Sequence, residues 1–475
     1  MYKNNYVQKL LWQFAEDREN RIALSVYDGT QIVNVTYCDL AKEILGVAAL
    51  LKNRGMVGKH IALLGSNGKE WLVYYLALVA NGNVVVPINP GLPREQILAQ
   101  CELADVSAIC GDEADISPFY NDLMCLKFEK PSADEMLALE EIAPVESSDL
   151  TMLLFTSGTT GESKAVEITY GNMESSLRSE EGVFQEQGIN RIMSVLPMFH
   201  IAGIRGTFAM LQRYKTVCIG RGAMYLFRDM PKLLPDYVPL VPVMVDSLVK
   251  IVRHTPQEEL GKFLGPNLKR ICVGGATVNA EDCRYLMARG FGIDCGYAMS
   301  ETTGVGTWGK WDDTHLNTLG KISNELECKV EDGEFLIKGP AVMKGYYKDP
   351  EATAQALENG WFHTGDLGFF DEDGYGYMTG RKKNLIVMSN GEKINPEELE
   401  CHFQKASVVR ECVISYCDGA LGMDVWTKDP EAVARLLEEY NTKMPLSHRI
   451  HRVTYRNKPI RRTASGKIMR EENGL

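Results

Sequence analysis

Short, fully apolar runs alternate with longer stretches through the first part of the chain. Residues 61–64 and 84–86 are continuous in apolar residues, and residues 70–80 and 93–101 have the length and composition of helices. This alternation is typical of β-α-β units. Further candidate buried strands, each followed by a glycine or proline break, are residues 108–110, 152–155, 191–196 and 269–273. We therefore predict an α/β fold with parallel-type sheets and loops at the strand ends.

The pattern changes after Gly320, where strands become short and turns frequent. Residues 334–337 and 374–378 are candidate strands, which predicts a smaller β-rich subregion. A compact α+β unit is predicted to follow, with a helix at 396–405, a strand at 409–416, a helix at 430–440 and a strand at 452–455.

Size and charge narrow the class of protein. A chain of 475 residues is longer than one core usually supports, and 45% hydrophobic residues are sufficient for large buried cores. We expect two or more folded domains. The net charge of −12 argues against a nucleic-acid backbone or an anionic membrane as the main partner, because either would require clustered Lys and Arg.

The spacing of the cysteines and the composition of residues 1–20 indicate the cellular compartment of the protein. The twelve cysteines are scattered without a C-x-x-C pair, so neither a zinc site nor a small disulfide scaffold is indicated. Residues 1–20 have no continuous apolar core of a secretory signal, and no run approaches the ~20 apolar residues of a membrane span. We expect reduced thiols and a cytoplasmic location.

One tract, LFTSGTTGESK at residues 154–164, carries the chemistry that a polyphosphate requires. Its glycines let backbone N–H groups approach phosphate oxygens, and its hydroxyls add donors. A Ser/Thr/Gly surface turn is the plainer interpretation, but it does not explain Lys164. The P-loop pattern fails, because Ser163 precedes that lysine and Ala165 follows it. We predict a phosphate-binding loop that closes on its ligand.

Four later segments complete a recognisable set: GYAMSET at 296–302, GWFHTGD at 360–366, GRKK at 380–383 and TASGK at 463–467. With the tract at 154–164, they occur in the order found in the acyl-adenylate-forming (AMP-dependent synthetase/ligase) superfamily, which the chain resembles. That superfamily includes acyl-CoA synthetases, adenylation domains and beetle luciferases. The resemblance spans more than three hundred residues and implies an ATP-dependent, AMP-forming ligase.

The resemblance implies where the phosphates and the metal bind. The β- and γ-phosphates would be held by Thr156, Ser157, Gly158, Thr159, Thr160 and Lys164. Relatives usually have proline at position 163 and glycine at 165, so Ser163 and Ala165 depart from the pattern while every phosphate donor remains. Glu301 would bind Mg²⁺, with Thr156 as a second oxygen ligand, since Mg²⁺ prefers oxygen and keeps substrate phosphates in its shell.

The remaining nucleotide contacts follow from the same resemblance. The adenine pocket would be formed by Gly274, Gly275, Ala276, Gly296 and Tyr297, small residues with one aromatic ring that stacks on the base. Ala298, Met299 and Ser300 of the same motif are also counted as nucleotide-binding residues. Asp366 would accept the ribose hydroxyls, because a carboxylate suits two vicinal hydroxyl donors. Arg381 would also reach the ribose.

The resemblance further implies a mobile C-terminal domain. Lys383 would be the hinge, which divides the chain into an N-terminal AMP-binding domain of residues 1–382 and a C-terminal domain of residues 383–475. Lys467 would bridge the substrate carboxylate and the α-phosphate during adenylation. Gly391 would leave room for the pantetheine arm of CoA. A further lysine found in relatives falls on Val387 here.

The acyl site is less defined by the sequence. His200 matches a position that lines this site and gates the approach to it, and we count it with Lys467, Glu301 and Lys164 as a candidate catalytic residue. Amino-acid-adenylating relatives commonly have an aspartate where this chain has His200, so an amino acid is disfavoured. Arg205, one helical turn later, raises the hypothesis of a second substrate carboxylate, as in a dicarboxylic or keto acid.

We predict a carboxylic acid–CoA ligase that uses ATP, Mg²⁺ and CoA and forms an acyl-adenylate, with fatty acids among the candidate substrates. The leading alternative is a freestanding adenylation enzyme that loads a phosphopantetheine carrier protein. A third interpretation is a non-catalytic nucleotide sensor. Retention of Lys164, Glu301, Asp366 and Lys467 together argues against the sensor, since drift would be expected to remove at least one of them.

Overall fold

The structure is a computed structural model that describes residues 5–132, 135–156, 163–179, 188–275, 278–388, 393–417 and 419–460. The smaller of its two large sheets has the strand order β18-β8-β7-β4-β3-β5-β6. Its strands are β3 (His60–Leu64), β4 (Val84–Ile88), β5 (Ala108–Gly111), β6 (Met124–Lys127), β7 (Leu150–Thr156), β8 (Lys164–Thr169) and β18 (Gly345–Tyr346). Strands β3 to β7 pair in parallel, which confirms the β-α-β prediction, whereas β8 and β18 are antiparallel additions at one edge.

The larger sheet has 14 strands within the described residues. Its parallel part runs β1-β10-β9-β11-β12-β13 and comprises β1 (Ile22–Tyr27), β9 (Arg191–Met193), β10 (Thr216–Ile219), β11 (Tyr237–Leu240), β12 (Arg270–Gly274) and β13 (Gly292–Ala298). Strand β2 (Ile32–Thr36) is antiparallel to β1 at one edge.

The short strands predicted after Gly320 are present, and they extend this larger sheet. They pair antiparallel and comprise β15 (Gly320–Ile322), β16 (Glu327–Glu331), β17 (Glu334–Lys338), β19 (Leu357–Glu358), β20 (Trp361–Phe370) and β21 (Tyr375–Arg381), and β14 (Gly306–Lys310), which precedes them, connects them to β13. The β-rich subregion therefore shares a sheet with the parallel strands through the β13–β14 pairing.

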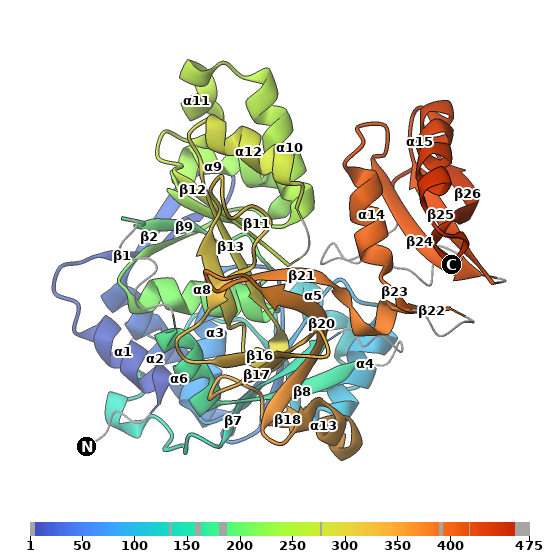
Figure 1. Cartoon of the computed structure of the whole chain (residues 1–475). Helices are drawn as coiled ribbons and strands as arrows, with labels where there is room; N and C mark the ends of the chain where they lie inside the picture. The colour runs from blue at the N-terminus through green and yellow to red at the C-terminus, as the bar shows by residue number, and fades with distance from the viewer. Residues whose placement is uncertain are drawn as a thin grey trace.

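Helix α3 (Lys69–Ala80) occupies the centre of the main core. Every residue from Trp71 to Ala80 is buried, as expected for a helix that is apolar on all sides. One core cluster contains α3 together with Leu63 of β3 and Val217 of β10, so apolar side chains from both large sheets meet around it. Figure 1 shows α3 deep inside the N-terminal part of the molecule.

The other helices cover these sheets or connect their strands. They are α1 (Tyr6–Ala15), α2 (Tyr37–Asn53), α4 (Arg94–Leu103), α5 (Glu113–Ile116), α6 (Tyr170–Arg178), α8 (Ile201–Gln212), α9 (Leu226–Leu233), α10 (Pro242–His254), α11 (Leu260–Leu264), α12 (Ala280–Ala288) and α13 (Pro350–Ala356). No helix in the described ranges combines the length and apolar character that crossing a lipid bilayer requires.

The C-terminal part has a core of its own, to the right in Figure 1. Its elements are β22 (Ile386–Val387), β23 (Lys393–Ile394), α14 (Pro396–Gln404), β24 (Glu411–Cys417), β25 (Ala420–Trp426), α15 (Pro430–Lys443) and β26 (Ile450–Arg456). Asn395, which caps α14, donates from Nδ2 to the carbonyl of Thr379 on β21 at 2.7 Å. The division at residue 383 stays a prediction.

Candidate active site

The β7–β8 hairpin brings the two ends of the predicted phosphate loop together. Thr156 and Lys164 are directly paired in its register, and the Thr156 hydroxyl lies 3.5 Å from the Lys164 carbonyl oxygen. Both residues are half-buried. The predicted donors Ser157, Gly158, Thr159 and Thr160 lie outside the described residues. The hairpin therefore presents the lysine and one hydroxyl at the end of a buried strand.

Glu301 lies in a short 3₁₀ turn, η5 (Ser300–Thr302), directly after β13. Its carbonyl accepts a hydrogen bond from the Met343 N–H at 2.7 Å, and its side chain accepts one from the Tyr346 hydroxyl at 3.1 Å. The residue is only 9% exposed. The ring of the same Tyr346 lies 5.0 Å from the Lys164 Nζ, so the strand-end lysine and the turn carboxylate share one neighbour.

These residues fit a magnesium ion that is bound mainly by substrate. Within the described ranges, no group of three or more His, Cys, Asp or Glu side chains could hold a metal by itself. Mg²⁺ usually keeps water and substrate phosphates and takes one or two carboxylates from the protein. One buried, hydrogen-bonded carboxylate at Glu301, with the Thr156 hydroxyl on the hairpin, agrees with that donor set.

The glycines assigned to the adenine pocket lie opposite each other on neighbouring strands. Gly274 of β12 pairs with Gly296 of β13. A Cβ at Gly296 would come within 3.2 Å of the Thr307 carbonyl oxygen, and Gly275 has a φ of +81° that favours glycine. Close strand packing favours glycine at 274 and 296, the backbone angle favours it at 275, and together they leave bare backbone where a flat base is expected. Ala276 lies outside the described residues.

Tyr297 and Arg381, both half-buried, form a polar cluster around the buried Asp366. The Tyr297 hydroxyl donates to Asp366 Oδ2 at 2.8 Å, and Arg381 Nε lies 3.0 Å from Asp366 Oδ1. The pairing of β20 with β21 sets Asp366 directly opposite Arg381. Burial and the Asp366 carboxylate raise the pKa of Tyr297 well above its ordinary value, so its phenol stays a donor. Tyr297 thus holds the carboxylate assigned to the ribose.

We predict that Tyr297→Phe destabilises the protein through Asp366. The carboxylate is 2% exposed, and loss of one donor to a buried charge costs about 1–3 kcal/mol. Tyr120→Phe is the matched control, because its hydroxyl also donates to a carboxylate, Glu113 at 2.6 Å, but at an exposed site. Urea denaturation measures both; equal losses for the two variants would contradict a special role for the buried pair.

His200 is the N-cap residue of α8 and is exposed. The loop before it is held by Asn67, which sequence reasoning missed: its Oδ1 accepts from Met198 N–H and its Nδ2 donates to the Leu196 carbonyl, both at 2.7 Å. Strand β9 ends at Met193 rather than at the predicted residue 196. The start of α8 lies against the turn after Glu301, where Gly304 approaches Ile201.

Arg205 points from α8 toward α6. Its guanidinium donates to the Ser176 hydroxyl at 2.8 Å and the Ser179 hydroxyl at 3.0 Å. These contacts favour a role in packing α6 against α8 over a direct contact with substrate.

The residues assigned to the mobile domain are only partly described. Lys383 is exposed in a short 3₁₀ turn, η6 (Lys382–Asn384), and Val387 is 60% exposed. Ala298, Met299 and Ser300 link β13 to the Glu301 turn. Gly391 and Lys467 lie outside the described residues, so the structure does not place them.

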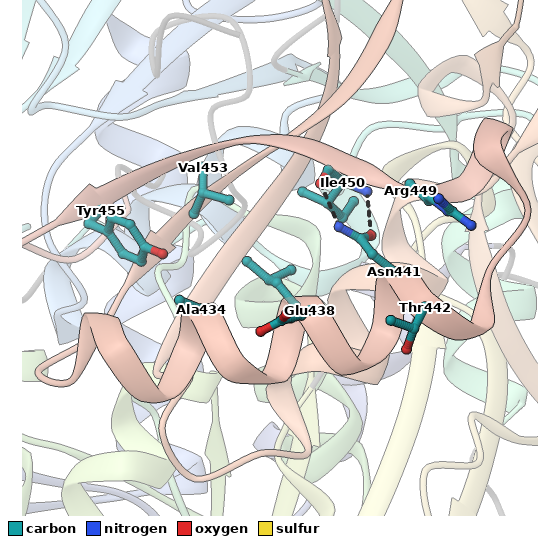
Figure 2. A pocket seen from close by; sticks show the side chains of 9 residues that line it. Ala434, Glu438, Asn441, Thr442, Arg449, Ile450, Val453 and Tyr455 are labelled. Carbon is teal, nitrogen blue, oxygen red and sulfur yellow. Dashed lines mark hydrogen bonds between the residues drawn. The ribbon is translucent and has the colours of Figure 1, made fainter.

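Two surface grooves lie away from this site. The larger, about 570 Å³, lies between α15 and β26 and is lined by residues that include Glu438, Arg449 and Tyr455. Figure 2 shows its Asn441 side chain bonded to the backbone of Ile450 by two hydrogen bonds of 2.9 Å. The second, about 420 Å³, is lined by residues that include Arg270 and Trp311. Neither groove includes a residue assigned above, so we base the site on the side-chain clusters.

Comparisons with known proteins bear on the family of the chain. The sequence model of the family described as AMP-binding enzyme matches residues 11–347, more than half of the chain. The chain is 28% identical over 425 residues to the 2-succinylbenzoate–CoA ligase of Bacillus cereus, covering 84% of this chain and 83% of that protein. It is 24% identical over 540 residues to the long-chain-fatty-acid–CoA ligase of Bacillus subtilis, covering 98% and 94%.

The fold is also that of a solved structure. The o-succinylbenzoate CoA synthetase of Bacillus subtilis, in complex with the acyl-adenylate intermediate, superposes with a TM-score of 0.84 at 24% sequence identity. The match covers 98% of this chain and 97% of that one.

Proposed function

Because the chain belongs to the AMP-binding enzyme family, we propose that it is an ATP-dependent carboxylic acid–CoA ligase that works through an acyl-adenylate. One observation carries the proposal: the segment from Tyr297 to Glu301 connects the cluster assigned to the ribose with the cluster assigned to the phosphates and the metal. At one end, Tyr297 holds the Asp366–Arg381 pair. At the other, Glu301 lies beside the Tyr346 that also contacts Lys164. A nucleotide bound along this segment would have its ribose and its phosphates at the two ends.

The reaction has two displacements. In the first, a carboxylate oxygen of the acid attacks the α-phosphorus of ATP, and the bond to the β-phosphate oxygen breaks to release pyrophosphate. In the second, the sulfur of CoA attacks the acyl carbon, the thiol proton leaves, and AMP departs with the former carboxylate oxygen. Both steps build negative charge, so fixed donors and a divalent cation contribute more than a protein nucleophile.

Each of the described residues has a role that its surroundings support, and the role of Lys467 follows from the resemblance. The Lys164 ammonium would neutralise charge on the phosphates, the Thr156 hydroxyl would donate to them, and Glu301 would hold Mg²⁺, which would neutralise further phosphate charge. Asp366 accepts the ribose hydroxyls, and Arg381 and Tyr297 orient its carboxylate. His200, exposed at the start of α8, lines the entry to the acyl site. Lys467 completes the adenylation site from the C-terminal domain, which rotates about Lys383.

The acceptor and the location belong to the same proposal. We take CoA as the acceptor, and a carrier-bound phosphopantetheine, which ends in the same thiol, as the alternative. We propose the cytoplasm as the location, and a structure in which none of the twelve cysteines forms a disulfide is compatible with a reducing compartment.

The direct test is a panel of fatty, aryl and dicarboxylic acids assayed for acid-dependent ATP–pyrophosphate exchange. We expect exchange with at least one class of acid and none without acid. The best acid is then offered with CoA or with a phosphopantetheinylated carrier protein. Thioester formation with CoA supports the proposal, and acylation of the carrier alone would replace it by the alternative.

We predict that Arg205→Leu weakens the α6–α8 contact without changing the choice of acid. Loss of two hydroxyl acceptors should lower the free energy of unfolding by about 1–2 kcal/mol, and activity should fall equally on mono- and dicarboxylic acids. Arg228→Leu is the control, since Arg228 is exposed on α9, away from the α6–α8 contact. A loss confined to dicarboxylic acids would instead assign Arg205 to a second substrate carboxylate.

A further inference from the structure

Tyr346 lies between the two charged groups to which we assign the metal and the phosphates. Its hydroxyl donates to Glu301 Oε1 at 3.1 Å. Its ring centre lies 5.0 Å from the Lys164 Nζ, within the range of a cation–π contact. None of the motifs found in the sequence contains Tyr346. One half-buried side chain therefore contacts both groups, through its hydroxyl and through its ring.

The pairing of β18 with β8 fixes the position of this tyrosine. Tyr346 lies opposite Val166, and Lys164, two residues earlier on β8, projects from the same face of the sheet. The diagonal neighbour across two strands is within reach of an aromatic side chain. The ring thus contacts Lys164 because of the register between β18 and β8. Small side-chain movements do not change this register.

The backbone around Tyr346 is anchored from two further directions. Its N–H donates to the Thr353 hydroxyl of α13 at 2.9 Å. Three residues earlier, Met343 N–H donates to the Glu301 carbonyl at 2.7 Å and ties the 3₁₀ turn to the same segment. A Cβ at Gly345 would come within 2.9 Å of the Thr353 side chain, so this glycine permits the close approach to α13. These contacts fix the backbone at Tyr346 relative to α13 and to the turn that contains Glu301.

We propose that Tyr346 is a positioning residue for adenylation: its hydroxyl orients the Glu301 carboxylate for the divalent cation, and its ring holds the Lys164 ammonium ready for the phosphates. The inference rests on the proposed function and adds a residue to its machinery. A hydrogen bond to one oxygen restricts rotation of the carboxylate, so less freedom is lost when the metal binds. A tyrosine phenol carries its proton at neutral pH, so it can donate to the carboxylate.

The test separates the hydroxyl from the ring. Tyr346→Phe keeps the ring and removes the donor to Glu301. We expect the Mg²⁺ concentration for half-maximal ATP–pyrophosphate exchange to rise about tenfold, the usual effect of losing a hydrogen bond to a charged group. Calorimetry should show the same weakening for ATP with Mg²⁺ present, whereas ATP binding in EDTA should stay within about twofold of wild type.

Removal of the ring should act on the phosphates as well. Tyr346→Leu, with Tyr346→Met as a second variant, is expected to weaken ATP binding in EDTA by about threefold, because the Lys164 ammonium loses its aromatic support. Tyr347→Phe is the matched control: this neighbouring hydroxyl donates to Asp105 Oδ2 at 2.9 Å on the exposed surface. It should give wild-type values in every assay.

Two results would overturn the inference. One is a wild-type Mg²⁺ dependence in Tyr346→Phe. The other is an equal weakening of ATP binding with and without Mg²⁺ in that variant, which would mark a purely structural residue. The binding assays need no carboxylic acid, so a wild-type protein that binds ATP and Mg²⁺ but activates no acid would refute the proposed function while leaving Tyr346 to be judged on binding alone.

Discussion

Glu301→Ala is expected to slow formation of the acyl-adenylate by about 10²–10³ at saturating ATP and Mg²⁺, the usual effect of removing one preorganised charge stabiliser. The carboxylate is 9% exposed and bonded to Tyr346, so its orientation is set before substrate arrives. Nothing else on the η5 turn can replace a charged oxygen ligand, since its other two residues are Ser300 and Thr302. The measurement is single-turnover adenylate formation by rapid quench.

Glu327→Ala is the control, because Glu327 is exposed on the edge strand β16. It should react at the wild-type rate. If Glu301→Ala only weakens ATP binding and leaves the single-turnover rate at saturation unchanged, Glu301 does not act in the chemical step and the metal assignment fails.

Lys467→Ala should separate the two half-reactions. The resemblance assigns Lys467 to adenylation alone, where its point charge offsets the repulsion between two anions. We expect adenylate formation to fall below detection, while chemically prepared acyl-adenylate and CoA still give thioester at nearly the wild-type rate. Gly391→Leu is the reverse case: exchange should persist and thioester formation should fail, because a branched side chain would obstruct the pantetheine path.

Lys458→Ala, which removes an exposed lysine nine residues earlier, is the control for a general loss of positive charge. It should leave both half-reactions intact. Equal depression of both half-reactions by Lys467→Ala and by Gly391→Leu would show that the two residues do not alternate in one site, and the hinge at Lys383 would lose its support.

Local patterns predicted most of the parallel fold. The apolar run that ends at Leu64 and the helix that ends at Ala80 were recognisable because a strand buried on both faces and a helix buried on all sides need no partner to be identified. Helices at 396–405 and 430–440 were placed within a few residues, since each has proline at its first position and a polar side chain that caps it, Asn395 and Asp429.

Pairing between strands that are distant in the chain could not be predicted from local sequence patterns. The strands after Gly320 were predicted as a subregion, and only the register Gly320–Gly376 and its neighbours reveal that they extend the larger sheet. Strand β25 was missed, although it pairs with both β24 and β26. For the same reason Tyr346 escaped notice: it meets Lys164 across 182 positions of sequence, through a two-residue strand with no periodicity to detect. The adjacent tyrosines at 346 and 347 after a glycine were the one local signal.

Transfer of carboxylate oxygen tests the central claim most directly. The acid that supports exchange is labelled with ¹⁸O in both carboxylate oxygens and converted with ATP and CoA, and the nucleotide and pyrophosphate are examined by mass spectrometry. An acyl-adenylate requires one labelled oxygen in AMP and none in pyrophosphate, because the attacking oxygen stays on the α-phosphorus when the thiol displaces AMP. Label in inorganic phosphate with release of ADP, or thioester formation with unlabelled AMP, would contradict the account.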